Sequence, residues 1–123
     1  MRSKSVGYSC ACLLLPAVLN NIGIVHRSAW ILQAGIAYAS DYLWSGVPHW
    51  SHGVDRWLSA SMVSATVTLG ARRVGLLAIP CTVLPLYCLY RSKSAIQWGE
   101  YERWHTLWHV FAGVIPVFVF IDR

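Results

Sequence analysis

Charged residues are scarce in this sequence, and their scarcity excludes an ordinary soluble domain. Only 12% of its 123 residues are charged, whereas soluble domains contain about 25%. So few charges cannot cover a surface that faces water. The charges that exist are gathered into short clusters, which leaves long apolar runs between them.

Ordered cysteine patterns and repeats are lacking as well. The four cysteines lie in or beside apolar runs, and no pair of them has the spacing of a zinc finger. Disulfide frameworks belong to small secreted scaffolds, so we expect these thiols to be buried and inert, as free cysteines usually are. No internal repeat or low-complexity segment is visible.

Hydrophobic residues are abundant instead, and they make up 56% of the chain. A bilayer core of about 30 Å needs about 20 helical residues, and five apolar runs approach that length. Continuous apolar runs favour helices over strands, because an open sheet edge in lipid leaves backbone groups unpaired. We therefore predict an all-α integral membrane protein, a single domain over residues 1–123 with about 4–5 transmembrane helices. The expected helices cover residues 9–25, 28–48, 56–72, 74–90 and 104–121.

The loops between these helices predict the orientation. With five spans, six of the ten Lys and Arg residues share the N-terminal side, which places that side in the cytoplasm or in the mitochondrial matrix. Six of the seven tryptophans lie near helix ends on the same side, as in an interfacial aromatic belt. The net charge of +5 then faces lipid headgroups, and no nucleic-acid partner is expected.

Polar and ionisable residues at membrane depth are costly and therefore usually functional or paired. Through five spans, the chain brings Ser45, His49, Asp55, His105 and His109 to one end of the bundle. His105 and His109 are four residues apart, so they share one helix face. Such a pair can take two corners of a zinc site, with His49 as the third ligand. The alternative is that these histidines bond neighbouring helices or lipid headgroups.

Asp41 is a second buried-charge candidate, one helical turn before Ser45. A lone buried carboxylate tends to stay protonated. We interpret it as a protonated acid or as an interhelical partner of Arg103, outside the histidine site.

The run Ser45-Gly-Val-Pro-His49, followed by Asp55 and by His105-Thr-Leu-Trp-His109, resembles the signature of the CREST superfamily. That family includes alkaline ceramidases, progestin and adipoQ receptors and myomaker-like proteins. The resemblance implies zinc held by His49, His105 and His109, with Ser45 and Asp55 as catalytic residues that position or deprotonate a water on the zinc. The family has seven helices, so this chain resembles a shortened member, with room for two spans between Asp55 and His105 where the family has four.

Two functions of different classes are expected from these observations. The first is a zinc hydrolase that acts on a lipid amide or ester, in the endoplasmic reticulum or Golgi as the resemblance implies. The second is a non-catalytic accessory subunit of a larger membrane complex, for example a respiratory or photosynthetic one, with the mitochondrial inner membrane as one location. In the second, the helices pack on lipids and other membrane subunits, and the small size of the chain favours it.

Overall fold

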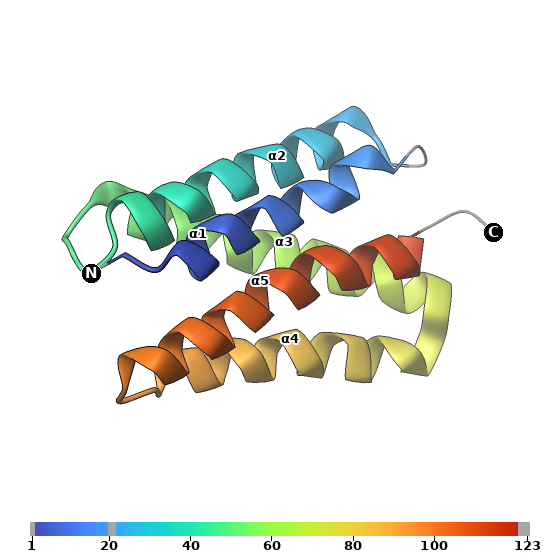
Figure 1. Ribbon diagram of the computed structural model, residues 1–123. Helices are drawn as coiled ribbons and strands as arrows, with labels where there is room; N and C mark the ends of the chain where they lie inside the picture. Colours follow the sequence, from blue (N-terminus) through green and yellow to red (C-terminus); the bar gives the residue numbers. More distant parts are fainter. Residues whose placement is uncertain (1, 20–21, 121–123) are drawn as a thin grey trace.

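The computed structural model describes residues 2–19 and 22–120, and these residues are almost entirely helical (Figure 1). No strand occurs within those two ranges, so the predicted all-α fold is confirmed. The elements, in chain order, are α1 Lys4–Ser9, the 3₁₀ helix η1 Cys10–Val18, α2 Ile24–Tyr38, the π-helix η2 Ala39–Leu43, α3 Trp50–Val74, the short 3₁₀ helix η3 Gly75–Leu77, α4 Ala78–Lys93 and α5 Trp98–Phe120.

Local signals move the helix ends away from the predicted bounds. The first helix begins at Lys4, because the Ser3 hydroxyl accepts a hydrogen bond from the Val6 amide and caps the helix. The second helical segment ends at Leu43. The turn that follows contains Gly46 at a φ of 73°, a backbone conformation that suits glycine. Positions 20, 21 and 121 of the predicted helices lie outside the described residues.

The chain reverses between α3 and α4, close to the turn predicted at Arg72 and Arg73. The reversal is made by η3, whose first residue, Gly75, has a φ of 62°. Residues other than glycine rarely adopt this φ. Figure 1 shows α3 running toward this turn and α4 running back from it.

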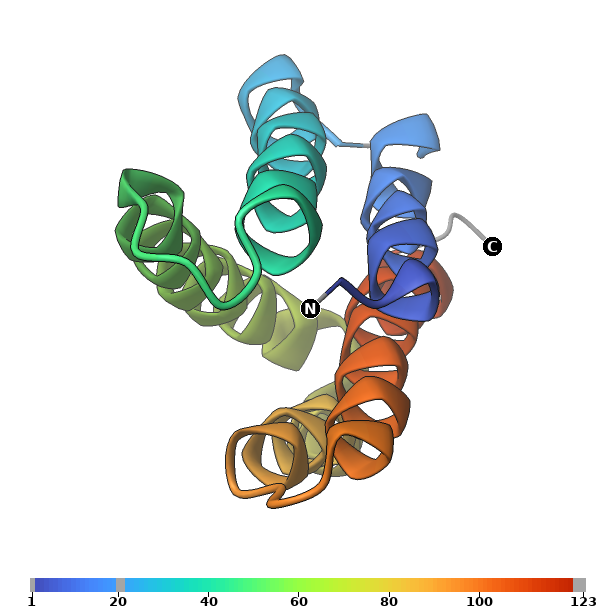
Figure 2. The same ribbon diagram turned by 60° about the vertical axis from the view of Figure 1, so that its left-hand side comes forward.

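The helices form an incomplete ring when viewed toward their ends (Figure 2). The segment made of α1 and η1 packs between α2 and α5, α4 packs along α5, and α3 packs against α2. A core of buried apolar side chains lies where these elements meet; its members are Cys10, Leu13, Trp30, Ala34, Ala37 and Met62.

Two glycines allow close approach of the first helical segment to its neighbours. A Cβ atom on Gly113 of α5 would lie 2.1 Å from the carbonyl oxygen of Cys12, and one on Gly7 would lie 2.8 Å from the Tyr42 ring. Any other residue at Gly113 forces the backbones of η1 and α5 apart, and any other residue at Gly7 must displace the Tyr42 ring. The first segment is therefore held tightly against both α5 and η2.

Apolar side chains also cover much of the outer surface. Leu76 is 83% exposed, Trp57 79% and Ile24 72%. Among the described residues, one helical stretch, Trp50–Lys93, is long and apolar enough to cross a membrane. It includes the turn at η3, so it consists of α3 and α4. By length and composition this stretch suits a membrane, and the several crossings expected from the sequence stay a prediction.

Candidate functional site

Asp41 lies between the two histidines of α5. One carboxylate oxygen, Oδ2, is 3.0 Å from His105 Nε2 and 2.9 Å from His109 Nε2. The three side chains are buried, with exposed fractions of 11%, 3% and 1%. The two imidazole rings stand nearly perpendicular to each other, with their centroids 4.7 Å apart. Both Nε2 atoms thus point at the same carboxylate oxygen.

The backbone around Asp41 is itself unusual. Asp41 lies in η2, where the Trp44 amide bonds to the carbonyl of Ala39, five residues earlier. Single turns of π-helix of this kind are rare and often occur at functional sites. This wide turn carries the carboxylate at the end of the second helical segment, facing α5.

Each histidine is anchored on its other ring nitrogen by a serine. His109 Nδ1 is 2.9 Å from Ser9 Oγ, and His105 Nδ1 is 3.1 Å from Ser92 Oγ. Each serine already donates its one hydroxyl proton to a helix carbonyl: Ser9 to Val6 at 2.8 Å, and Ser92 to Leu89 at 2.8 Å. From these bonds we assign the serine oxygens as acceptors and place the imidazole protons on Nδ1; the opposite tautomer would have each serine donate to Nδ1.

This assignment has a consequence for the charge at Asp41. A neutral imidazole has one N–H, so with the proton on Nδ1 the Nε2 atoms of His105 and His109 present lone pairs. Lone pairs 2.9–3.0 Å from a carboxylate oxygen repel it, unless a positive charge lies between them. With the protons on Nδ1, two extra protons or a metal cation supplies that charge, whereas in the opposite tautomer each Nε2–H donates to Asp41 Oδ2. Hydrogen-bond acceptors on the far nitrogens of histidines are typical partners of metal-bound imidazoles.

Cys10 offers a second set of ligand atoms. Cys10, Asp41 and His109 each place one ligand atom within 4.8 Å of the others, so this group could hold a metal ion. The Cys10 sulfur lies 3.7 Å from His109 Nδ1 and donates its proton to the Val6 carbonyl. The sulfur approaches the His109 ring at Nδ1, whereas the Asp41 oxygen approaches it at Nε2. Two alternative donor sets share Asp41 and His109.

Asp55 of α3 lines the same pocket as Asp41 and is held by a residue of α2. The Gln33 amide nitrogen of α2 donates to Asp55 Oδ1 at 2.9 Å and to Ser59 Oγ at 3.0 Å. Asp55 and Ser59 are four residues apart on α3, so one face of that helix presents both. Gln33 is in turn two helical turns before Asp41 along the second helical segment.

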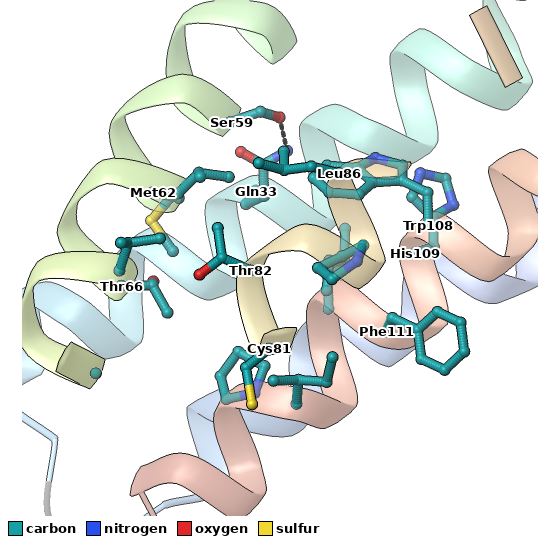
Figure 3. A pocket seen from close by; sticks show the side chains of 18 of the residues that line it. Gln33, Ser59, Met62, Thr66, Cys81, Thr82, Leu86, Trp108, His109 and Phe111 are labelled. Atoms are coloured by element: carbon teal, nitrogen blue, oxygen red, sulfur yellow. Dashed lines mark hydrogen bonds between the residues drawn. The ribbon is translucent and has the colours of Figure 1, made fainter. Parts of the chain in front are cut away.

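A groove connects these polar residues to an apolar region between α2, α3, α4 and α5 (Figure 3). Asp41, Asp55, Gln33 and His109 line one part of it. The rest is lined largely by apolar side chains, among which are Met62, Val67, Ile115, Pro116 and Val119. The groove therefore has a polar end and an apolar length.

The structure places the remaining expected site residues elsewhere. His49 caps the start of α3, where its Nδ1 accepts from the Ser51 amide, and its ring stacks on Trp44 with centroids 4.2 Å apart. Ser45 lies in the turn between η2 and α3. The structure thus brings His105, His109 and Asp55 to the same region and does not bring His49 or Ser45 there. The physical reason is that the second helical segment ends at Leu43, before either residue.

Several residues of this site were not expected from the sequence. Asp41 was interpreted as a protonated acid or as a partner of Arg103, whereas its partners in the structure are His105 and His109. Ser9, Ser92 and Gln33 carried no sequence signal of their own. Gln33 and Asp41 are eight residues apart, so they lie on one face of the helical segment. This spacing could have indicated that the two polar side chains lie together.

Comparisons with known proteins add no relative. No family model matches the chain, and no curated protein or solved structure matches it either. The function is therefore argued from the site itself.

Proposed function

We propose that the chain is a membrane-embedded metal hydrolase that acts on a lipid, with Asp41, His105 and His109 as the metal ligands. The observation that carries this proposal is the convergence of two Nε2 atoms on one oxygen of the Asp41 carboxylate, with each Nδ1 atom within hydrogen-bond distance of a serine hydroxyl. Two extra protons on the buried pair would leave a net positive charge there. One divalent cation would serve all three ligand atoms at once.

The donor set fits zinc. Two histidines and one carboxylate hold the metal in several zinc hydrolases and leave one position open for chemistry. A zinc ion bound there would act as a Lewis acid and would lower the pKa of water. The same donor types also hold iron(II) in oxygenases, so the metal must be identified by analysis.

The residues around the ligands have separate roles in this proposal. Ser9 and Ser92 orient the imidazoles through Nδ1. Asp55 lies beside the groove, held through Oδ1 by Gln33, and it is the candidate general base, as expected from the sequence. A carboxylate within reach of the attacking water can accept its proton. His49 and Ser45 have no part in the chemistry.

The groove and the outer surface favour a lipid substrate. The polar end of the groove includes Asp41 and His109, and its apolar length can take a hydrocarbon chain. A hydrocarbon tail that entered the groove from the bilayer would not have to pass through water. The exposed apolar side chains of α3 and α4 suit helices that lie in a membrane. We therefore propose a polytopic helical bundle with its active site near one membrane face.

Metal analysis of the detergent-purified protein tests the proposal. Wild-type protein prepared without chelators should contain one equivalent of zinc by mass spectrometry. Alanine at Asp41, His105 or His109 should release most of it, whereas His49→Ala, a matched histidine at the same end of the bundle, should retain it. Hydrolysis of a short-chain lipid amide and of the matching ester should follow the metal content.

Three results would count against all or part of this proposal. If the wild-type protein contains no stoichiometric metal, the hydrolase proposal is wrong and the accessory-subunit hypothesis stands. If iron rather than zinc is found, the ligand assignment holds and the reaction does not. If His49→Ala loses the metal as completely as His105→Ala, Asp41 is not the third ligand and His49 is.

A further inference from the structure

Gln33 has a buried carbonyl oxygen that has no hydrogen-bond partner among the described residues. The residue is 5% exposed and lines the groove (Figure 3). Its amide nitrogen is already committed to Asp55 and Ser59. Because an ionised carboxylate only accepts hydrogen bonds, the nitrogen must face Asp55, and Oε1 is left as a free acceptor.

A buried acceptor without a donor is costly, and such atoms in folded proteins call for an explanation. Asp55 cannot provide the donor, because it is itself an acceptor toward Gln33. The groove is the open space beside Gln33. Oε1 itself is covered, and since Gln33 lines the groove, a small movement of its side chain would bring the oxygen to a ligand N–H or O–H there.

We infer that Gln33 selects the lipid by a hydrogen-bond donor in its polar head, while a single hydrocarbon tail fills the apolar length of the groove. The inference rests on the proposed function, which puts the reacting carbonyl at the polar end near Asp41 and His109. Gln33 then contacts the group next to that carbonyl. It is a specificity-determining residue, and it does not take part in the reaction.

The shape of the groove supports a single tail. From His109 to Val119 along α5, the lining residues span about 15 Å at 1.5 Å per residue. The lining beyond Gln33 is mostly apolar along that length. Thr66 is one of the few polar residues in the lining, and its buried hydroxyl oxygen also has no partner among the described residues. It provides a matched control, because it lies in the same groove and is separate from the Gln33 contacts.

Paired probes that differ in one donor test the inference. The first pair is N-propyl dodecanamide and propyl dodecanoate, which differ by an N–H. The second is 2-hydroxyethyl dodecanoate and its methyl ether, which differ by an O–H. Binding is measured in detergent with chelator present, by displacement of a brominated dodecanoyl chain that quenches Trp30 and Trp108, which line the groove.

The donor-containing member of at least one pair should bind wild-type protein about tenfold more tightly, as one hydrogen bond to a buried acceptor predicts. The pair that shows the preference identifies N–H or O–H as the group that is read. Gln33→Met should reduce that ratio to about one. Thr66→Val should leave it unchanged.

Two results would overturn the inference: no preference for either donor in the wild-type protein, or a preference that persists in Gln33→Met. The wild-type comparison remains decisive even if Gln33→Met does not fold. Because chelator removes metal from every sample, a failure of the metal proposal leaves the ratio intact. If wild-type protein binds zinc and hydrolyses lipid but shows no preference for either donor, only the role of Gln33 is refuted.

Discussion

The serine on His105 gives the sharpest test of how the site is built. Ser92→Ala removes the hydroxyl that lies 3.1 Å from His105 Nδ1. Without that acceptor, the proton is no longer held on Nδ1, and the ring is free to present an N–H toward Asp41 in place of a lone pair. Loss of such a partner typically weakens metal binding by about 10–100-fold, which corresponds to about 1.4–2.7 kcal/mol.

The assay is competition for zinc between the purified protein and a chelator of known affinity. Ser94→Ala is a matched control, because Ser94 follows the same helix and its hydroxyl donates to the carbonyls of Tyr90 and Arg91. It should bind zinc as the wild type does. An unchanged affinity in Ser92→Ala would refute the assignment of the Nδ1 protons, and with it the main physical argument for a metal at Asp41.

Three further predictions concern the donor geometry, the packing and the membrane topology. Cys10→Ala should keep the full metal content, because its sulfur lies on the Nδ1 side of His109; loss of metal would favour the Cys10 donor set instead. Gly113→Ala should lower the free energy of unfolding in detergent by about 1–3 kcal/mol or more, because the added methyl group overpacks on η1. Gly70→Ala, whose Cβ would meet its nearest neighbour at 3.5 Å, should be neutral or stabilising by up to about 1 kcal/mol. If the bundle spans a membrane, single cysteines at Ser94 and Leu76 should be labelled from opposite sides, since they follow and precede α4; labelling from one side would exclude that span.

The sequence predicted the helices better than it predicted their ends. Apolar runs separated by charge clusters indicate helices, because helix formation and burial in an apolar environment both depend on a long stretch of chain. The ends depend on single contacts, such as the Ser3 hydroxyl on the Val6 amide and the positive φ of Gly46. The residues are visible in the sequence, and the conformations they adopt are not.

The same distinction explains what could be predicted of the candidate site. Residues four apart on one helix must share a face, so the neighbourhood of His105 and His109 follows from spacing alone. The third group depends on where a different helix stops. Because η2 is a π-turn, the carboxylate at Asp41 meets the histidines, and His49 is left to cap α3. A one-turn difference in a helix end therefore exchanged one candidate ligand for another.

The groups of this site are also brought together from opposite ends of the chain. Ser9 belongs to the first helix, Asp41 to the second segment, Ser92 to α4, and both histidines to α5. Asp41 and Ser9 do not meet the histidines until the bundle has closed, and the contact of Ser9 with His109 at 2.9 Å requires α1 to lie directly against α5. A cation bound at Asp41 would therefore bind the folded bundle and not the unfolded chain. Since any ligand with that preference stabilises the folded state, metal binding and the packing of the first helix on α5 should be thermodynamically coupled.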